Sequence, residues 1–340
     1  MKKKLLITLL CLLLLGIAAI GAAAYVLLAN NTAVTENTRL LVPQQTTMEQ
    51  LQAQLDEQQI LKNGKTFQWT CRLMRFKTPR TGKYTIEPGS SNIQLVRLLR
   101  RGQHYPVDFT FNNLRTVDQL VQKTDGKFFF EKEELSALLQ DTAYLQQYGF
   151  TPYTLPSAFI PNSYQIYYDI TAQEFFEKMY AEYQKFWTEK RKQLADSIGL
   201  TPAEVATLAS IVEEENRRPA EKSIIAGLYM NRLHKDMLLQ SDPTVKFALG
   251  DFTRQRILNA DLQVDSPYNT YKYRGLPPGP IRIPEASTLD SVLHYRHHDY
   301  LYMCAKEDFS GYHNFTASAA VHAQNAARYR AALNKRNIKR

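Results

Sequence analysis

The sequence predicts an α+β protein with an N-terminal transmembrane helix, and three observations lead to this fold class. An apolar run of bilayer length stands at the N-terminus. Short strand-like runs then alternate with amphipathic helices, each opened by a Ser or Thr three residues before a Gln or Glu. The C-terminal third places stiff loops rich in Pro and Gly around one acidic helix. With 340 residues, the chain is too long for one ordinary core, so we expect several domains.

The first predicted element is a membrane anchor within residues 1–29. Lys2–Lys4 precede the apolar run Leu5–Leu28, which is long enough to span a bilayer. Because basic residues stay in the cytoplasm, the rest of the chain is expected outside it, held on the plasma (inner) membrane by a single pass. A cleaved signal peptide is the competing interpretation, since Ala22–Ala24 offer small residues at a cleavage point. Tyr25–Leu28 continue the apolar run and favour an uncleaved anchor.

Residues 30–110 are expected to hold a polar, extended linker and a small α+β module. Capping boxes at Thr47–Gln50 and Ser91–Gln94 each open an amphipathic helix. Strand-like runs lie at Lys83–Ile86 and Val107–Phe111. The alternation indicates a small unit of short strands and helices that is repeated. Ordinary α+β structure without shared ancestry would give the same spacing.

Residues 111–199 are predicted to form a helix-rich intermediate region. A capping box at Thr171–Glu174 opens a long helix that continues to Trp187. Aromatic side chains recur along it at helical spacing, which favours a packed core over a sugar-binding platform. Before this helix, Phe159–Tyr164 is expected to be a loop that contains Pro and exposes aromatic rings.

The helix predicted over residues 201–216 is the element around which the C-terminal part is organised. Thr201 is a good N-cap, Pro202 suits the first helical position, and Glu204 completes a capping box. At about 100° per residue, four apolar side chains fall on one stripe that should face the core. These are Val205, Leu208, Ile211 and Val212.

Three consecutive carboxylates end this helix. Glu215 continues the apolar stripe, whereas Glu213 and Glu214 lie on its two flanks. Burial disfavours an ionised carboxylate, so the pKa of Glu215 should rise. A carboxyl group that stays protonated near neutral pH is what a general acid requires for a glycosidic leaving group. The alternative is a Glu run that is simply solvated at the end of a helix.

The C-terminal segments, within residues 200–340, look like a binding cleft on a scaffold. Leu238–Val245 is expected to break a helix at Pro243, and Ser266–Tyr271 and Arg274–Ile281 are loops stiffened by Pro and Gly. A strand at Tyr300–Cys304 and an Ala-rich helix from about 319 to 333 complete this part. Stiff loops with Asp, Asn and Tyr beside an acidic helix are typical of a ligand site.

Composition limits the partners and cofactors. A net charge of +9 suits an anionic membrane surface or a polyanion. Nucleic acid is not expected, since zinc-finger spacing, an RNA-binding aromatic motif and a basic helix are all absent from the sequence. The three Cys residues form no Cys-x-x-Cys pair, and the run His294–His298 lacks partners at metal-ligand spacing, so no metal is predicted. Without a nucleotide loop or dinucleotide fingerprint, no cofactor is expected either.

Five motifs together resemble those of a known family. They occur in the order Leu-Ala-Ser-Ile-Val-Glu-Glu-Glu (208–215), Gln-Ser-Asp-Pro-Thr-Val (240–245), Tyr-Asn-Thr-Tyr (268–271), Gly-Leu-Pro-Pro-Gly-Pro-Ile (275–281) and His-Asn-Phe (313–315). On these residues the chain resembles the endolytic murein (peptidoglycan) transglycosylases of the MltG/YceG-like family. The resemblance implies a LysM-like module in residues 30–110 and a catalytic domain over residues 200–340.

The resemblance also implies roles for the acidic run. The family has Glu-x-Glu here, and its second Glu is the catalytic acid, which corresponds to Glu215. Glu213 corresponds to the first Glu and is expected either to tune the acid or to fix neighbouring loops. Family members often carry Lys between the two acids and Thr after them, whereas this chain has Glu214 and Asn216. The extra negative charge of Glu214 should raise the neighbouring pKa slightly.

The implied reaction is cleavage of the β-1,4 bond between N-acetylmuramic acid and N-acetylglucosamine within nascent peptidoglycan strands. The muramyl C6 hydroxyl attacks C1 and leaves a 1,6-anhydro end, so the enzyme is formally a lyase; it would limit strand length. Peptidoglycan synthases in the membrane are implied partners. Two alternatives stay open at this point: a wall-binding scaffold protein without activity, and a glycan hydrolase that uses Glu215 and Asp242.

Residues from the loop motifs are candidates for binding the sugar. Tyr268, Asn269 and Tyr271 are expected to hydrogen-bond or stack on it, although roles in bracing the loop fit equally well. Asp242 either joins the site or braces its own loop before Pro243. The remaining candidates are Asn314 and its neighbour His313.

Overall fold

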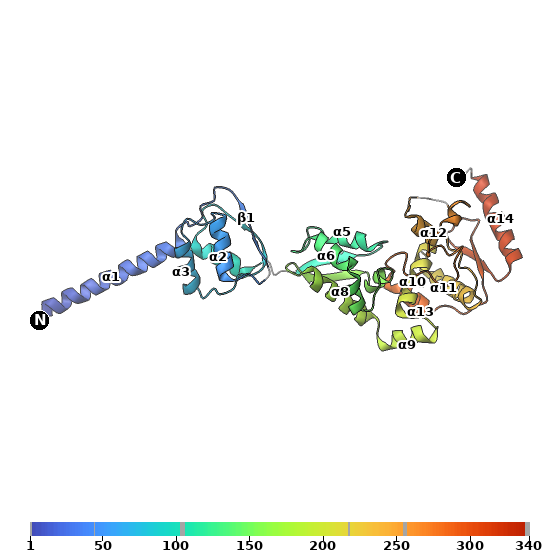
Figure 1. Cartoon of the computed structure of the whole chain (residues 1–340), viewed down its shortest axis with the longest axis horizontal. Coiled ribbons are helices and arrows are strands. Elements are labelled where there is room, and N and C mark those ends of the chain that lie inside the picture. Colours follow the sequence, from blue (N-terminus) through green and yellow to red (C-terminus); the bar gives the residue numbers. More distant parts are fainter. Residues whose placement is uncertain (1, 44, 103–105, 217, 254–256, 337–340) are drawn as a thin grey trace. The chain divides into compact units, whose positions relative to one another are not determined.

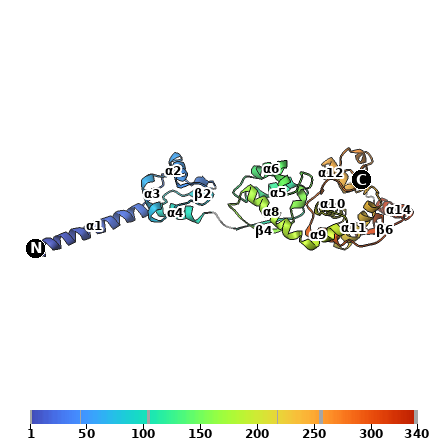
Figure 2. The ribbon, with the colours of Figure 1, turned by 60° about the horizontal axis from the view of Figure 1, so that its bottom comes forward.

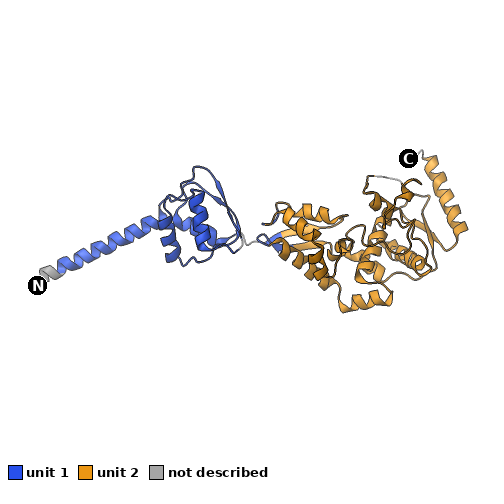
Figure 3. Cartoon of the chain, viewed as in Figure 1, with its two compact units in different colours: residues 1–107, 127–129, 165–170 blue, residues 108–126, 130–164, 171–340 orange. Residues whose placement is uncertain are grey.

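The computed structural model describes residues 2–43, 45–102, 106–216, 218–253 and 257–336. It is a mixed α+β chain that begins with one apolar helix, as the sequence predicted (Figure 1). The chain divides into two compact units, each with a hydrophobic core of its own (Figure 3). Unit 1 comprises residues 1–107, 127–129 and 165–170, and unit 2 comprises 108–126, 130–164 and 171–340.

The apolar helix α1 (Lys2–Leu28) opens unit 1. Its segment Leu6–Leu28 has 23 residues and a mean hydropathy of 2.7, which suffices by length and composition to cross a membrane. A signal sequence would meet the same criteria. The end of α1 is tied to the following module, because the Asn92 side-chain amide donates to the Val26 carbonyl at 2.8 Å.

The rest of unit 1 has a strand–helix–helix–strand order followed by one more helix. Its elements are β1 (Thr38–Val42), α2 (Met48–Glu57), α3 (Gly64–Leu73), β2 (Gly82–Ile86) and α4 (Asn92–Arg101). The strands β1 and β2 pair antiparallel, with Leu40 opposite Tyr84. The predicted capping boxes at Thr47 and Ser91 are confirmed, with each hydroxyl and its Gln partner bonded reciprocally.

The segment expected to be an extended linker contains a buried strand. Leu40 and Val42 of β1 have no exposed surface, and they pack with the alternating buried side chains of β2. The sequence did not reveal this strand, because a five-residue strand with one short partner carries little periodic signal.

A second pair of strands and four helices occupy the middle of the chain. The elements are β3 (Pro106–Phe111), α5 (Val117–Thr124), α6 (Lys132–Gln140), α7 (Thr142–Gln147), the 3₁₀ turn η1 (Leu155–Ala158), β4 (Asn162–Tyr167) and α8 (Ala172–Phe186). β3 pairs with β4. The prediction that Phe159–Tyr164 forms a loop with exposed aromatic rings is wrong. Phe159 and Tyr164 are buried, and Tyr164 stacks on Phe111 in the strand pair with ring centroids 5.8 Å apart.

The aromatic side chains of α8 form core, as predicted. Phe175, Phe176 and Met179 are almost fully buried, and Trp187 caps the helix end while remaining buried. Phe175 meets Phe109 edge-on at 5.4 Å, so α8 covers strand β3.

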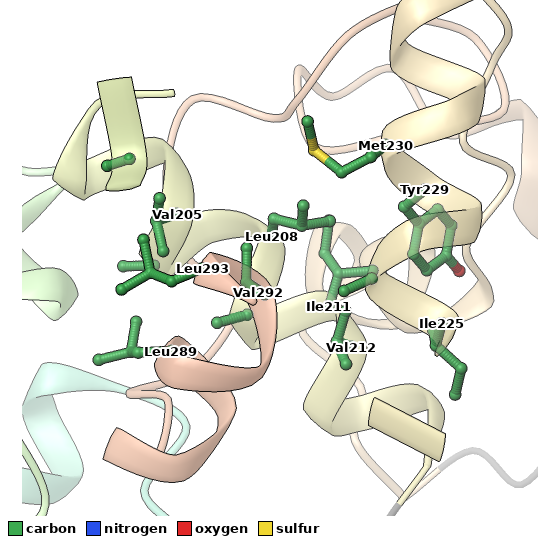
Figure 4. Close-up of a cluster of buried hydrophobic side chains, with 14 of the residues drawn as sticks. Val205, Leu208, Ile211, Val212, Ile225, Tyr229, Met230, Leu289, Val292 and Leu293 are labelled. Atoms are coloured by element: carbon green, nitrogen blue, oxygen red, sulfur yellow. The ribbon is translucent and has the colours of Figure 1, made fainter. Parts of the chain in front are cut away.

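The C-terminal part of unit 2 is built around α10. Its elements are α9 (Glu189–Ser197), α10 (Pro202–Glu215), α11 (Pro219–His234), α12 (Asp242–Leu249), η2 (Asp261–Gln263), α13 (Ala286–Leu293), β5 (Tyr302–Ala305), β6 (His313–Thr316) and α14 (Ala319–Lys335). α10 and α11 lie side by side in both views (Figure 1, Figure 2). The core beside them also takes in α13 (Figure 4). The labelled side chains of that core are Val205, Leu208, Ile211 and Val212 of α10, Ile225, Tyr229 and Met230 of α11, and Leu289, Val292 and Leu293 of α13.

The helix α10 is buried on all sides rather than along one stripe. Every residue from Val205 to Glu213 is buried, including the small and polar ones between the predicted apolar positions. Ser210 illustrates how a polar side chain is accommodated, since its hydroxyl donates to the Thr207 carbonyl and accepts from the Ile281 amide at 2.9 Å. The predicted N-terminal capping box at Thr201 is present.

Pro243 starts a helix instead of breaking one. The preceding helix α11 has already ended at His234, and Pro243 lies in the first turn of α12. This placement follows from the chemistry of proline, whose missing amide hydrogen costs nothing in the first turn. The consequence is that Ser241 and Asp242 stand at the start of a helix, close to the end of α10.

Candidate active site

Glu215 is the last residue of α10 and is held by two neighbouring elements. Its Oε1 accepts a hydrogen bond from the Tyr229 hydroxyl of α11 at 2.6 Å. The same oxygen accepts from Ser241 Oγ, just before α12, at 2.7 Å. The helix stops at this point because Asn216 adopts an extended conformation. Three segments of the chain therefore converge on one carboxyl group.

Burial raises the pKa of Glu215 above its ordinary value. The hydrogen bonds from Tyr229 and Ser241 act in the opposite direction, because they stabilise the ionised form. The charge of Asp242 adds to the upward shift. The net effect is upward, which agrees in direction with the prediction from the helical wheel.

Glu215 lies in a cleft of about 360 Å³. The cleft is bounded by α11, by the start of α12 with the following loop, and by the β5–β6 hairpin. Its lining mixes polar and apolar groups: Glu215, Leu228, Tyr229, Arg232, Leu239, Gln240, Asp242, Tyr271, Met303, Cys304, Ala305, His313 and His322. A volume of this size accommodates a small polar group such as part of a sugar chain.

Asp242 and Tyr271 line the cleft together. The Tyr271 hydroxyl donates to Asp242 Oδ1 at 2.5 Å. Burial first, and this hydrogen bond second, raise the pKa of Tyr271, so its hydroxyl stays protonated and remains a donor. The structure thus brings together Glu215 and two of the predicted sugar-binding residues.

Glu213 and Glu214 point away from the cleft and are not solvated. Glu213 is 7% exposed and lies 3.2 Å from an Arg282 nitrogen. Its Oε2 accepts from Thr288 Oγ1 at 2.8 Å. Glu214 pairs with Arg282 at 2.7 Å and with Arg115 at 3.2 Å. The alternative of a solvated Glu run is therefore wrong, and Glu213 is far more enclosed than its place on the flank of the stripe suggested.

Comparison with known proteins assigns this chain to one family. Residues 40–328 match the YceG-like family. The chain belongs to the YceG-like family. It is 26% identical over 310 residues to the Bacillus subtilis (strain 168) protein named endolytic murein transglycosylase, with 87% of this chain and 85% of that protein covered.

Two further matches extend this picture. A Streptococcus pneumoniae (strain D39) protein, also named endolytic murein transglycosylase, is 26% identical over 294 residues, with 78% of this chain and 53% of that protein covered. This YceG-like chain therefore spans about half the length of its pneumococcal relative. A 2.6 Å crystal structure of a putative yceG-like protein from Listeria monocytogenes aligns with a TM-score of 0.56 at 24% identity, covering 86% of this chain and 99% of that one, which supports the fold.

Tyr268 and Asn269 brace the loop of this YceG-like chain rather than line its cleft. Tyr268 is 9% exposed and packs on Phe247 with ring centroids 4.6 Å apart, and burial raises its pKa to about 12. Asn269 is fully buried, and its side-chain amide donates to the carbonyls of Leu262 and Val264. Of the two roles that the sequence left open for these residues, bracing the loop is the one that fits their positions.

Asn314 does not reach the cleft, whereas its neighbour His313 does. The Asn314 amide donates to Glu307 Oε2 at 3.1 Å. His313 is among the residues that line the cleft, and Asn314 is not. The structure therefore does not bring Asn314 to the cleft, and its role in binding the sugar stays a prediction.

Sequence reasoning missed Tyr229, Ser241 and Arg232. Arg232 is 7% exposed, and its guanidinium donates to the carbonyls of Leu238, Leu239 and Leu301. Ser241 stands inside the Gln-Ser-Asp-Pro-Thr-Val motif, so its hydroxyl beside Asp242 was the available signal. Tyr229 lies in a mainly apolar helix and carried no such signal.

Within the run His294–His298, His298 has a structural role. His298 Nε2 lies 2.8 Å from the Ile224 carbonyl of α11, and its Nδ1 accepts from the Tyr300 amide at 3.0 Å. Within the described residues, no group of three or more His, Cys, Asp or Glu side chains is arranged to hold a metal ion.

Proposed function

We propose that this chain is an endolytic murein transglycosylase. It would cut the β-1,4 bond between N-acetylmuramic acid and N-acetylglucosamine inside peptidoglycan strands and leave 1,6-anhydro ends. One observation carries the proposal, which is the environment of Glu215 in the cleft. Burial raises the pKa of Glu215, and the hydroxyls of Tyr229 and Ser241 hold its carboxyl group in place. Relatives named for this activity match most of the chain and support the same reaction.

In the first step, Glu215 acts as the general acid. Oε1 already accepts hydrogen bonds from Tyr229 and Ser241, so the carboxyl hydrogen belongs on Oε2. The Oε2–H bond breaks as its hydrogen passes to the glycosidic oxygen. The bond between C1 of the muramyl residue and that oxygen breaks with both electrons going to the oxygen. The N-acetylglucosamine end leaves with a hydroxyl group, and C1 is left electron-poor.

In the second step, the same carboxyl group acts as the base. Glu215 is now a carboxylate, and it removes the hydrogen of the muramyl C6 hydroxyl. O6 forms a bond to C1, which closes the 1,6-anhydro ring and returns the proton to Glu215. Water is not consumed, and the starting protonation state is restored. One carboxyl group with a raised pKa therefore suffices for both steps.

We assign Asp242 and Tyr271 to positioning the glycan and to tuning Glu215. The negative charge of Asp242 helps to keep Glu215 protonated, since two nearby carboxylates resist ionising together. The Tyr271 hydroxyl occupies one oxygen of Asp242, which leaves the other for a sugar hydroxyl. Glu213 would support the acid indirectly, because it fixes the end of α10 to Arg282 and Thr288.

The domain layout is also a proposal. Residues 30–110 would contain a LysM-like glycan-binding module, which the strand–helix–helix–strand order and the antiparallel pairing of β1 and β2 support. Residues 111–199 would connect it to the catalytic domain at 200–340. Residues 1–29 would anchor the chain in the plasma membrane, with Lys2–Lys4 in the cytoplasm.

An anchored enzyme of this kind would act where glycan strands are made. The apolar helix would hold the catalytic domain near the outer face of the membrane, so nascent strands and the synthases that make them would be its partners. Cutting inside such strands would limit their length.

The variant Glu215→Gln tests the reaction and the acid together. Gln keeps the size of the side chain and an oxygen that accepts from Tyr229 and Ser241, but it cannot deliver a proton. The full chain in detergent and its E215Q form would be incubated with purified glycan strands, and the product ends read by mass. We expect internal fragments with anhydro ends from the wild type and a loss of activity of at least about 10³-fold in the variant.

Other outcomes would redirect the proposal. Reducing ends, heavier by one water than anhydro ends, would favour a hydrolase and make Asp242 the next residue to mutate. Anhydro ends from both forms would exclude Glu215 as the acid. Binding of strands without cleavage by the wild type would favour a wall-binding protein. Melting curves of both forms control for loss of fold.

A further inference from the structure

Glu221 of α11 holds His313 of β6 at two points. Glu221 Oε2 lies 2.9 Å from His313 Nδ1, and Oε1 accepts from the His313 backbone amide at 3.0 Å. The Glu221 side chain is 7% exposed and that of His313 is 15% exposed. This two-point clamp fixes both the position of the strand and the rotation of the imidazole ring.

The clamp also decides which ring nitrogen carries the hydrogen. A carboxylate oxygen only accepts, so Nδ1 carries the hydrogen that is donated to Glu221. Asn216 donates to the same Oε2 at 2.5 Å, which joins the residue after Glu215 to the clamp. In the neutral ring, Nε2 is then an acceptor with a free lone pair.

His313 lines the cleft that contains Glu215, while its Nδ1 edge is bonded to Glu221. His313 lines this cleft with Glu215, Asp242 and Tyr271. Among the described residues, none donates to Nε2 or accepts from it, whereas every other polar atom of the clamp is bonded. An acceptor held rigidly at the wall of a polar cleft is suited to a donor on a ligand.

We propose that His313 is a second glycan-contacting residue of the active site, whose Nε2 accepts a hydrogen bond from a sugar hydroxyl bound beside Glu215. Glu221 is its positioning residue. The inference rests on the proposed transglycosylase function and deepens it, because it assigns one contact that orients the sugar for attack at C1. It adds no proton transfer to the reaction, which remains with Glu215.

A purely structural role for His313 makes a different prediction from a contact role. The Nδ1 contact ties β6 to α11 and serves stability, whereas Nε2 would serve the substrate. The amide nitrogen of Asn takes roughly the place of Nδ1, and the amide end of Gln reaches roughly that of Nε2. The variants His313→Asn and His313→Gln therefore separate the two roles.

The experiment compares these two variants in the full chain. For each, the melting temperature and kcat/KM for forming anhydro ends on purified glycan strands would be measured. We expect H313N to melt near the wild type and to lose about tenfold in kcat/KM, which corresponds to about 1.4 kcal/mol and lies within the range for one lost hydrogen bond. We expect H313Q to melt lower but to retain more activity than H313N. His294→Asn, at an exposed position, is the matched control.

The inference would be overturned if kcat/KM changed in parallel with the melting temperature, so that H313N stayed close to the wild type and H313Q was impaired. A wild-type protein that forms no anhydro ends would count against the proposed function. In that case, a binding measurement would still test the contact between His313 and the glycan. The affinity of short glycan fragments for E215Q would be compared with that for E215Q carrying H313N or H313Q. A weaker affinity with H313N alone supports the contact; equal affinities for the three forms reject it.

Discussion

At the scale of single residues, the site depends on opposing influences on Glu215. Burial and the charge of Asp242 favour the protonated carboxyl, whereas the hydroxyls of Tyr229 and Ser241 favour the carboxylate. A group that must give up a proton and then take one back needs such a balance, because either extreme would block one step. The direction of each influence makes the pH dependence predictable.

The variant Tyr229→Phe should move the alkaline limit of activity to higher pH. The Tyr229 hydroxyl stabilises ionised Glu215, so its removal raises the pKa of Glu215 further. The acid acts only while protonated, and activity falls as pH rises through its pKa. We expect the alkaline limb of kcat/KM to shift upward by about one unit, since a hydrogen bond to a charged group is worth about 1.5–3 kcal/mol.

The measurement is a pH profile of anhydro-end formation. Tyr268→Phe is the matched control, because Tyr268 packs in the core on Phe247 and does not bond Glu215. A limb that stays in place in Y229F, or one that moves equally in Y268F, would contradict the explanation.

At the scale of elements, the sequence predicted well those helices that open with a capping box. The capping boxes at Thr47, Ser91, Thr171 and Thr201 are all present, because a cap and its partner lie within one turn and need no tertiary structure. The strands β1, β4 and β6 were missed. They have four to six residues in two-stranded sheets, so most of what stabilises them is packing against distant segments.

In the candidate site too, some residues could be predicted from local sequence and others depend on distant packing. Glu215 was accessible from the sequence because the helix period and the motif resemblance both indicated it. The period alone does not distinguish it from Glu213, since α10 is buried on all sides. Its partners Tyr229 and Ser241 lie 14 and 26 residues away, so only the packing of α11 and α12 brings them together. Motif spacing likewise could not separate His313, which lines the cleft, from Asn314, which does not.

The loop 275–281 contains a glycine that the packing requires. A Cβ atom on Gly279 would lie 1.9 Å from the Tyr153 carbonyl oxygen, which belongs to the backbone and cannot move aside alone. Gly279→Ala should therefore destabilise unit 2 by about 1–3 kcal/mol or more, as overpacking does. Denaturant unfolding of the full chain measures this.

Gly64→Ala provides the comparison for that substitution. Its Cβ would mainly meet the end of the flexible Gln52 side chain, which has room to shift. We expect a clearly smaller effect than for G279A, and equal effects would mean that contact with the Tyr153 backbone is not the cause.

At the scale of the whole molecule, the net charge is confined to the N-terminal part. Residues 30–107 contain eleven basic and five acidic residues, and residues 108–340 contain twenty-eight of each. The first 29 residues add Lys2–Lys4. The part that includes the proposed catalytic domain is therefore neutral overall, and attraction to polyanions belongs to unit 1.

Replacing Arg72, Arg97 and Arg101 with Gln should weaken binding to polyanions. All three side chains are exposed, on or next to α3 and α4. We expect the full chain to leave an anionic polymer matrix at a clearly lower salt concentration, because electrostatic attraction falls with net charge and with screening.

A second triple variant serves as the control for that measurement. Lys178 and Lys185 of unit 2 both pair with Glu182, and Lys192 pairs with Glu189, so two carboxylates on the same helices offset most of their charge. Their replacement with Gln should lower the elution salt less. The same loss in both variants would mean that total charge, and not its location, controls binding.

The end of α10 gives one residue type three different environments. Successive side chains leave a helix about 100° apart, so the three glutamates meet different neighbours. Glu213 and Glu214 share Arg282, and Glu213 also bonds Thr288 whereas Glu214 also pairs with Arg115. Glu215 alone bonds Tyr229 of α11. Deleting one residue of α10 before Glu213 would rotate all three side chains toward the wrong neighbours, although the three consecutive glutamates would remain in the sequence. The orientation of the helix, more than the composition of the run, thus determines which glutamate faces the cleft.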